Sequence, residues 1–187
     1  PPLFDVFTTY AGRPLIVKCA PGLDHRMLRD RFGFDGLVQV TSLDGGVREA
    51  CLWTEPSGPA RRRATVVRTA PDATVTRVDI DDDEPDVIPT GVIGSWIIDP
   101  DGAIVRAGLV RQYGHRHGLA MLDPQIAYLT GDVVPPGDRG FRIVEQVGVA
   151  EKALRKALAA HDCGTLEILI RGLDVDPDQL RKKLKLK

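Results

Sequence analysis

Cysteine is scarce in this chain. The 187 residues include three cysteines, Cys19, Cys51 and Cys163, which lie far apart in the sequence. An odd number of cysteines with no Cys-x-x-Cys pair suggests neither a disulfide framework nor a zinc site. Buried thiols in a reducing compartment are the simplest account of them. The pattern therefore predicts a cytoplasmic protein without a structural metal.

Long apolar runs are also missing. No run approaches the roughly eighteen residues that cross a bilayer, and the first residues show no signal-peptide pattern, so we expect no membrane partner. The formal net charge of −1 excludes a protein that coats nucleic acid over its whole surface, although an acidic middle and a basic end leave room for local patches. Aromatic residues make up 5% of the chain, which provides poorly for stacking on unpaired bases.

Most catalytic and nucleotide-binding motifs are absent. There is no Gly-x-Ser-x-Gly elbow, no P-loop and no Gly-x-Gly-x-x-Gly loop. His115 and His117 are two residues apart and cannot share a helix face, so a helix end is favoured over a metal site. The acidic run 81–84 could bind a divalent cation, but a solvated linker is favoured because the spacing of a calcium loop is missing. If a nucleotide-like cofactor binds, its main cradle lies outside this chain.

The segments that are present alternate between strand and helix patterns in the first third. Strands are predicted at 15–19, 37–43, 47–53 and 63–68, the first of them as a buried parallel strand. Asp24 is the expected N-cap of a helix over 25–32, and Asp44-Gly45-Gly46 indicates a hairpin turn. Residues 69–89, with three prolines and the acidic run, are the best candidate for a domain boundary or a solvated loop.

The second unit is expected to start near residue 91. Around 99–102 a hairpin competes with a helix that Asp99 caps and that runs to about 113, and we favour the helix from its one-turn apolar spacing. Short strands are predicted at 126–130, 141–147 and 165–170. A helix over 150–160 should end at Gly164, and another should begin at Pro177 with Asp176 as its N-cap.

Two groups of residues are candidates for binding. Lys18, Pro21, Gly22 and Asp24 follow an apolar strand, at the end where open α/β sheets hold ligands, although a simple strand-to-helix connection is an equally good interpretation. The second group consists of C-terminal cations that either bind phosphate or form a solvated face. Its members are Arg171, Arg181, Lys182, Lys183, Lys185 and Lys187.

Six strings occur in order along nearly the whole chain and together resemble one family. They are IVKCAPGLDH, VTSLDGGVREACLW, RRRATVV, IIDPDGAIVRAGLV, LDPQIAYLTGD and RGLDVDPDQLRKKLKLK. The sequence resembles the C-terminal part of bacterial class I S-adenosylmethionine-dependent methyltransferases that end in a THUMP-like domain. The resemblance implies an α/β fold, in which residues 1–70 close a Rossmann-like methyltransferase sheet. Residues 71–90 would be a linker, and 91–187 a small α+β THUMP-like domain.

The same resemblance implies S-adenosylmethionine as the cofactor, bound mainly by residues upstream of Pro1. The glycine loop, the acidic ribose-binding residue and the Asp-Pro motif of this family are not found in the chain, nor is its usual final hairpin. We therefore expect the 187 residues alone to be inactive. Lys18, Pro21, Gly22 and Asp24 would shape the substrate side of the site.

RNA is the expected substrate, because THUMP domains in RNA-modifying enzymes bind RNA and because the C-terminal helix is basic. Fold analogy is an associational argument, so a second function stays open. In that alternative the chain is a non-catalytic RNA- or protein-interaction module, and the methyltransferase portion has only a structural role.

Overall fold

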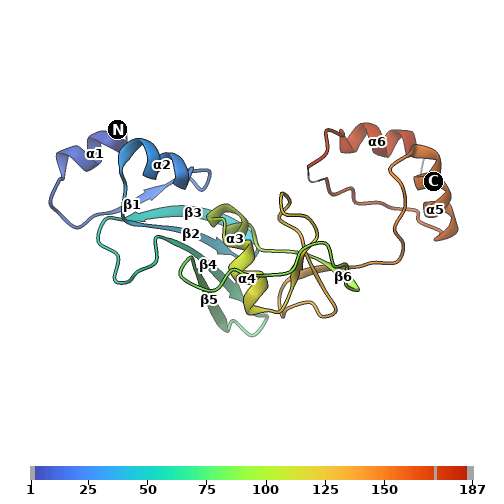
Figure 1. Cartoon of the computed structure of the whole chain (residues 1–187), viewed down its shortest axis with the longest axis horizontal. Coiled ribbons are helices and arrows are strands. Elements are labelled where there is room, and N and C mark those ends of the chain that lie inside the picture. The colour runs from blue at the N-terminus through green and yellow to red at the C-terminus, as the bar shows by residue number, and fades with distance from the viewer. Residues whose placement is uncertain (1–2, 171, 185–187) are drawn as a thin grey trace.

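The computed structural model describes residues 3–170 and 172–184. Its helices and strands run along an extended body, with α1 and α2 at one end and α5 and α6 at the other (Figure 1). The helices are α1 (Leu3–Thr9), α2 (His25–Phe32), α3 (Gly102–Ala107), α4 (Val110–Arg116), α5 (Glu151–Ala160) and α6 (Pro177–Leu184). The strands are β1 (Ile16–Cys19), β2 (Leu37–Leu43), β3 (Gly46–Trp53), β4 (Arg62–Thr69), β5 (Val75–Asp81), β6 (Trp96–Asp99), β7 (Ala120–Met121), β8 (Leu129–Gly131) and β9 (Arg139–Arg142).

Strands β1 to β5 form a mixed sheet in the order β1-β3-β2-β4-β5. Strand β3 runs antiparallel to both of its neighbours, β1 and β2, whereas β2 and β4 are parallel. The hairpin predicted between β2 and β3 is confirmed, and its turn residues Asp44 and Gly45 have φ of 51° and 77°. Positive φ at both positions matches the twist of a two-residue hairpin. The prediction that the first strand is a buried parallel strand is wrong, because β1 pairs antiparallel with β3 and alternates between exposed and half-buried residues.

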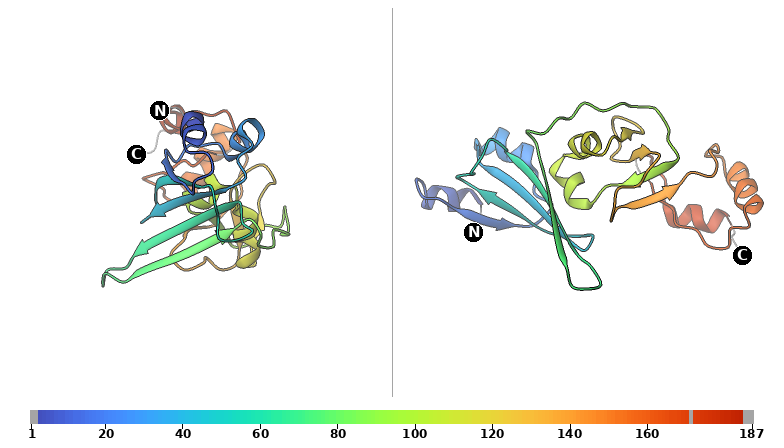
Figure 2. Two further views of the ribbon diagram at one scale, coloured as in Figure 1. Left: turned by 90° about the vertical axis from the view of Figure 1, so that its left-hand side faces the viewer. Right: turned by 90° about the horizontal axis from the view of Figure 1, so that it is seen from below.

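One face of this sheet is apolar because β2, β3 and β4 alternate. Val38 and Leu52 point toward α1 and α2, where they pack with the buried Leu28. Farther along the same face, Val40 and Ala64 join a second cluster that includes residues of α3, α4, β6 and β8. The second cluster continues from the five-stranded sheet into the rest of the body. The views in Figure 2 show α1 and α2 beside the sheet, and α3 and α4 near the centre of the molecule.

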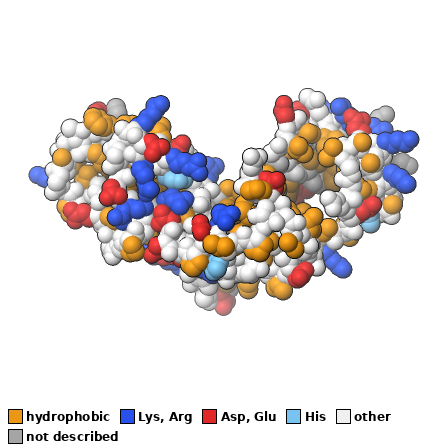
Figure 3. Space-filling view, viewed as in Figure 1, with side chains coloured by type: hydrophobic (Ala, Val, Ile, Leu, Met, Phe, Trp, Pro, Cys, Tyr) orange, Lys and Arg blue, Asp and Glu red, His pale blue; other side chains and the backbone are white. Residues whose placement is uncertain are grey.

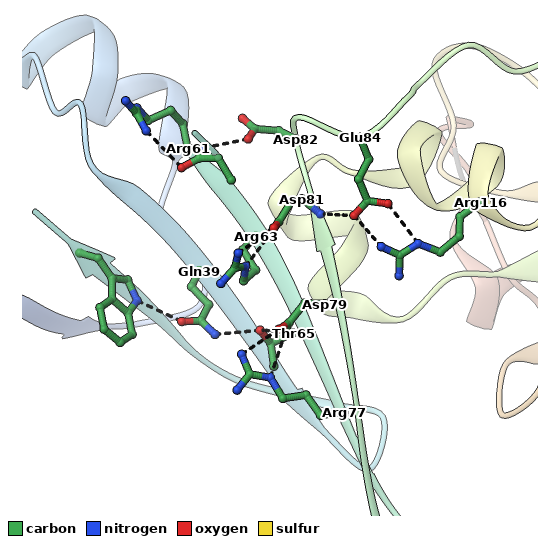
Figure 4. A network of polar contacts seen from close by, with 12 residues as sticks. Gln39, Arg61, Arg63, Thr65, Arg77, Asp79, Asp81, Asp82, Glu84 and Arg116 are labelled. Carbon is green, nitrogen blue, oxygen red and sulfur yellow. Dashed lines mark hydrogen bonds and ion pairs between the residues drawn. The ribbon is translucent and has the colours of Figure 1, made fainter. Parts of the chain in front are cut away.

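The other face of the sheet carries a chain of polar contacts (Figure 4). Trp53 Nε1 donates to Gln39 Oε1 at 3.0 Å, and Gln39 Nε2 donates to Thr65 Oγ1 at 2.8 Å. The Thr65 hydroxyl donates in turn to Asp79 Oδ1 at 2.6 Å. These contacts cross four strands, so this face is held together by hydrogen bonds between side chains as well as by the backbone ladder.

The loop predicted over 69–89 is wrong at its centre, because residues 75–81 form β5 and pair with β4. Its acidic run meets the arginines of β4. Arg63 forms a bidentate pair with Asp81, both contacts at 2.6 Å, and Arg62 Nε lies 3.2 Å from Asp82 Oδ2. Glu84 pairs with Arg116 of α4 at 2.6 Å. Weak periodicity made this strand hard to predict, because the partners of its acidic residues lie on a different strand, β4. The division of the chain at 71–90 stays a prediction.

Between the two sheets, the structure resolves the choice around 99–102. A helix forms, but Asp99 belongs to β6 and the N-cap is Asp101, whose carboxylate accepts from Ala103 N at 2.8 Å. Gly108, with φ of 69°, ends α3 where the sequence predicted an unbroken helix to about 113. A separate helix, α4, follows at once. A four-stranded sheet in the order β7-β8-β6-β9 packs beside these helices.

The C-terminal part consists of α5 and α6, which contact each other, and the segments that connect them. The cap of α6 is confirmed, since Asp176 Oδ1 accepts from the backbone nitrogens of Asp178 and Gln179 at 2.9 and 3.2 Å. The helix predicted over 150–160 is confirmed as α5 (Glu151–Ala160), but its C-cap is His161 and not the expected Gly164. Residues 165–170 are not a strand, and β8 and β9 are shorter than the predicted strands.

A buried carboxylate joins α4 to both sheets. The side chain of Asp138, 1% exposed, accepts from Arg68 Nη2 of β4 at 2.7 Å and also from the hydroxyl of Tyr113. Burial, and then the hydrogen bond to Asp138, raise the pKa of Tyr113 far above its usual value, so its proton stays on the phenol. Asp138 therefore has two donors that compensate for its loss of solvent.

We expect Tyr113→Phe to lower the free energy of unfolding by about 1 to 3 kcal/mol, because it removes one donor from a buried carboxylate. Urea denaturation measures this directly. Tyr10→Phe, at a residue 46% exposed, is the matched control and should leave the unfolding midpoint unchanged. Equal midpoints for the two variants would contradict the role assigned to the Tyr113 hydroxyl.

Candidate functional site

The segment that follows β1 is a surface turn with one buried anchor. Pro21 and Gly22 form the turn, and Leu23 N donates to Ala20 O at 3.3 Å. The side chain of Leu23 packs against both hydrophobic clusters, whereas Gly22 is exposed. Leu23 thus anchors the turn to the core, while Gly22 stays accessible to solvent.

Asp24, the last residue of this segment, caps α2 as the sequence predicts. Its Oδ1 accepts from Arg26 N at 2.8 Å and from Met27 N at 3.2 Å. These two backbone hydrogen bonds lower the pKa of Asp24, so the carboxylate is ionised at neutral pH. Gly33, with φ of 61°, ends the helix after Phe32. The Asp24 carboxylate therefore already has partners in its own helix.

Lys18 lies in β1 and pairs with Glu49 of β3, with Nζ 2.9 Å from Oε2. The hydrogen bond to Glu49 and its negative charge raise the pKa of Lys18, so the amine stays protonated and is unsuited to act as a base. Lys18 alternates with Val17 and Cys19, which pack on the helix-covered face. The structure therefore separates Lys18 from the core side of the strand while Pro21, Gly22 and Asp24 stay together in the loop.

The thiols near this segment are poorly suited to act as nucleophiles. Burial raises the pKa of Cys19 and of Cys51, and the carboxylate of Glu49 raises that of Cys51 further. A thiol with a raised pKa is a poor nucleophile at neutral pH. The histidines are at the end of α4, where His117 is the C-cap and His115 Nδ1 lies 3.0 Å from Val87 O. No group of three potential metal ligands occurs in residues 3–170 and 172–184.

The cations of α6 differ in whether a carboxylate pairs with them. Arg181 Nη1 lies 2.6 Å from Asp178 Oδ1, and Lys183 Nζ lies 3.2 Å from Glu151 Oε1 of α5. Lys182 is exposed and has no salt bridge within the described part of the chain. Arg171, Lys185 and Lys187 lie outside the described residues. Helix α6 therefore presents less positive charge than its sequence indicates.

Two exposed lysines of α5 were not among the sequence candidates. Lys152 and Lys156 are one turn apart on this helix, which packs against α6. Their i,i+4 spacing was a usable signal, because residues four apart share a helix face. They add to the charge of Lys182 on the C-terminal part of the molecule.

Comparison with known proteins agrees with the family resemblance. Residues 138–187 match the family model described as THUMP domain-like. Two curated proteins, from two strains of Mycobacterium tuberculosis, are each named an uncharacterized S-adenosylmethionine-dependent methyltransferase. Each is 50% identical to this chain over 189 residues, and the match covers 100% of this chain and 51% of the relative. The chain thus spans about half the length of the curated relatives it matches.

The fold is similar to a crystal structure of a protein from Porphyromonas gingivalis that is described as a methyltransferase. The TM-score is 0.70 with 20% sequence identity, and the match covers 92% of this chain and 45% of the other. Together these findings confirm a mixed α/β fold and a resemblance to the C-terminal part of S-adenosylmethionine-dependent methyltransferases, with a THUMP-like segment at 138–187. No helix of the described residues has the length and apolar character needed to cross a membrane.

The two roles available to Asp24, helix cap and substrate contact, predict different mutant behaviour. Asp24→Ala should lower the melting temperature, because the backbone nitrogens at the start of α2 lose their acceptor. Asp24→Asn keeps an acceptor oxygen and should melt close to the unaltered protein. Because the pKa of Asp24 is lowered by folding, its stabilising effect should be complete above the ordinary value of 3.8 and be lost as the pH falls through the folded-state value.

Circular dichroism melts of both variants between pH 2 and pH 7 check this expectation. Equal melting temperatures for the Asn and Ala variants at neutral pH would show that the cap does not stabilise the fold. If the Asn variant melts normally but the full-length protein carrying it loses activity, Asp24 also contributes to substrate binding.

Proposed function

We propose that the full-length protein transfers a methyl group from S-adenosylmethionine to RNA in the cytoplasm. The observation that carries this proposal is the 50% identity, over the whole chain, to proteins named as S-adenosylmethionine-dependent methyltransferases. The methyl group would move by direct displacement, in which the acceptor atom of the RNA attacks the methyl carbon as its bond to sulfur breaks and S-adenosylhomocysteine leaves, so no covalent enzyme intermediate is needed. In such a reaction the protein aligns the two substrates and excludes water.

In this proposal, residues 1–70 complete a Rossmann-like methyltransferase sheet. The position of antiparallel β3 between β1 and β2 supports this, since the family resemblance implies an antiparallel last strand. The S-adenosylmethionine would be held mainly by residues outside these 187, because the chain has no glycine-rich cofactor loop. Pro21, Gly22 and Asp24 would border the substrate, and Lys18 would support the sheet through its pair with Glu49.

The THUMP-like part would contribute RNA binding. The match over 138–187 and the exposed lysines of α5 and α6 support this role. Residues 91–187 would form the α+β domain that carries it, although apolar side chains from both sides of residue 91 share one cluster. The alternative, a non-catalytic RNA- or protein-interaction module, is supported by the structural tasks of Lys18 and Asp24, which both have partners within the chain.

A methyl-transfer assay distinguishes the RNA methyltransferase from the non-catalytic interaction module. We expect the full-length protein, incubated with S-adenosylmethionine carrying a labelled methyl group, to label a cellular RNA fraction. Label in a protein fraction instead would overturn RNA as the substrate. Absence of label in both fractions, from a correctly folded protein, would favour the non-catalytic alternative.

Calorimetry tests where the cofactor binds. The 187 residues alone should show no measurable heat of S-adenosylmethionine binding, whereas the full-length protein should bind it. Micromolar affinity of the shorter chain would overturn the proposal that the cofactor cradle lies elsewhere. A melting curve of the shorter chain verifies that it is folded during the measurement.

Salt dependence tests the C-terminal lysines. If they contact phosphates, RNA affinity should fall steeply as salt rises, because each contact releases a counterion. Lys182→Glu together with Lys185→Glu should weaken binding and make the plot of log affinity against log salt shallower. A reversal of Arg181, which already pairs with Asp178, should have the smaller effect. Binding that is independent of salt would count against RNA contact through these residues.

A further inference from the structure

A second basic surface lies at the opposite end of the molecule from α6. It consists of Arg26 and Arg29 of α2 and Arg106 of α3, beside His25, and is called here the α2–α3 basic surface. All three arginines are exposed. The space-filling view shows Lys and Arg side chains gathered around a histidine over this end of the molecule (Figure 3).

Contacts at the end of α3 bring the two helices together. The Arg62 side chain reaches from β4 and donates to the carbonyl oxygens of Ala107 and Gly108, both at 3.1 Å. An ideal Cβ built on Gly108 would lie 3.0 Å from Arg62 Nη1 and 3.6 Å from His25 Cε1. The backbone of residue 108 therefore lies near the side chain of His25, the first residue of α2. Arg106, two residues before Gly108, is thus near the start of that helix although it follows His25 by 81 positions in the chain.

The geometry of α2 determines which of its side chains belong to the surface. Leu28 is buried against the sheet, which fixes the orientation of the helix. At 100° per residue, His25 and Arg29 are on one flank, Arg26 is on the outer side and Arg31 is on the opposite flank. Arg31 is equally exposed. Arg31 is therefore a control position, because its substitution removes the same charge from α2 outside the proposed surface.

The arginines of the α2–α3 basic surface lack the salt bridges that several other arginines of the chain form. Arg62, Arg63 and Arg68 each form a salt bridge with an aspartate. By contrast, the side chains of Arg26, Arg29 and Arg106 make no salt bridge or hydrogen bond within residues 3–170 and 172–184. Two of the nearby carboxylates have other partners, since Asp24 caps α2 and Asp82 pairs with Arg62. Asp30, one turn after Arg26 on the exposed side of α2, is the counter-charge within this helix, and it forms no salt bridge with either arginine in the described part of the chain.

The pKa of His25 is affected by its burial and by the positive charges around it. Burial lowers the pKa of His25, and Arg62, Arg26 and Arg29 lower it further, outweighing the attraction of Asp24. Arg26, Arg29 and Arg106 outnumber the one carboxylate of α2 and α3, Asp30, and this excess of positive charge would attract an anionic ligand. The surface is therefore suited to a ligand with several negative charges.

We propose that the α2–α3 basic surface binds the phosphate backbone of RNA and guides it to the turn at Pro21 and Gly22. The proposal rests on RNA being the substrate of the protein. The turn leads directly into α2, because Gly22 lies two residues before Asp24, the N-cap of the helix, so a strand lying along Arg29 and Arg26 runs toward the turn. Guanidinium groups match phosphates as bidentate donors.

An exposed aromatic ring favours nucleic acid over an acidic protein as the ligand. Phe32 lies three residues after Arg29 on the same flank of α2, is 44% exposed, and has its ring centroid 6.1 Å from that of Phe4. Bases of a single strand stack on such rings irrespective of their sequence. Single-stranded RNA offers phosphates to the arginines and an unpaired base to the ring, so this arrangement favours single-stranded RNA.

The test compares two pairs of substitutions in the full-length protein, with a labelled 20-nucleotide single-stranded RNA as the probe. Arg26→Gln with Arg29→Gln removes two charges from the surface, and Arg31→Gln with Arg142→Gln removes two from exposed positions outside it. At about 0.15 M salt we expect the first pair to weaken binding on the order of tenfold or more, and the second pair less than about twofold. The first pair should also reduce the salt slope by about 1 to 2.

Two single substitutions extend the test across the surface. Arg106→Gln should weaken binding further when added to the α2 pair, because it lies on the other helix of the same surface. Phe32→Ala should lower affinity for the single strand by about fivefold or more while leaving the salt slope unchanged, because stacking releases no counterions. Thermal melts confirm that all variants are folded.

The outcomes separate this proposal from the proposed function. If the unaltered protein binds RNA and the two pairs of substitutions weaken binding equally, the α2–α3 basic surface is not the binding surface. The proposed function, with RNA held by other residues such as Lys182, is unaffected by that result. If the unaltered protein binds no RNA, both proposals fail. If an acidic peptide or anionic vesicles compete with RNA at equal charge concentration, the surface recognises charge alone and the assignment to RNA is overturned.

Discussion

The side chain of Arg62 connects three parts of the molecule that are far apart in the sequence. It pairs with Asp82 at the end of β5 and donates to the last carbonyls of α3. Unsatisfied carbonyl oxygens at a helix C-terminus attract a cation, and a guanidinium group can serve them and a carboxylate at once. This contact fixes α3 against the sheet and beside α2. The α2–α3 basic surface depends on it.

The charges of this chain illustrate why composition says little about a binding surface. A run of three arginines and a run of four acids look in the sequence like two separate charged patches, but β4 and β5 place them side by side. Arg62 and Arg63 pair with Asp82 and Asp81, so both runs lose much of their charge. Arginines that stay unpaired within the described residues include Arg26 and Arg29 of α2 and Arg106 of α3. Their separation in the sequence gives no sign that they form one surface.

Much of the first third was predictable, because its signals are local. The N-cap at Asp24 and the hairpin turn at Asp44 and Gly45 depend on residues within a few positions of each other. Strand β5 was missed because its side chains are mostly exposed and do not alternate between apolar and polar residues. The break between α3 and α4 was missed because Val105 and Leu109 fit a continuous helix, whereas the positive φ of Gly108 ends it. Among the site candidates, the partners of Lys18 and Lys183 lie in other elements, which the sequence does not reveal, whereas Arg181 pairs with Asp178 three residues earlier in the same helix.

The sequence by itself determined the caps at Asp24 and Asp176, the hairpin turn between β2 and β3 and the resemblance to methyltransferases with a THUMP-like end. These features depend on neighbouring residues or on the order of motifs along the chain. Tertiary structure decided which charges neutralise one another, because an ion pair depends on distance in space and not on spacing in the chain. It also decided that Arg106 lies beside α2, through the contact of Arg62 with the end of α3.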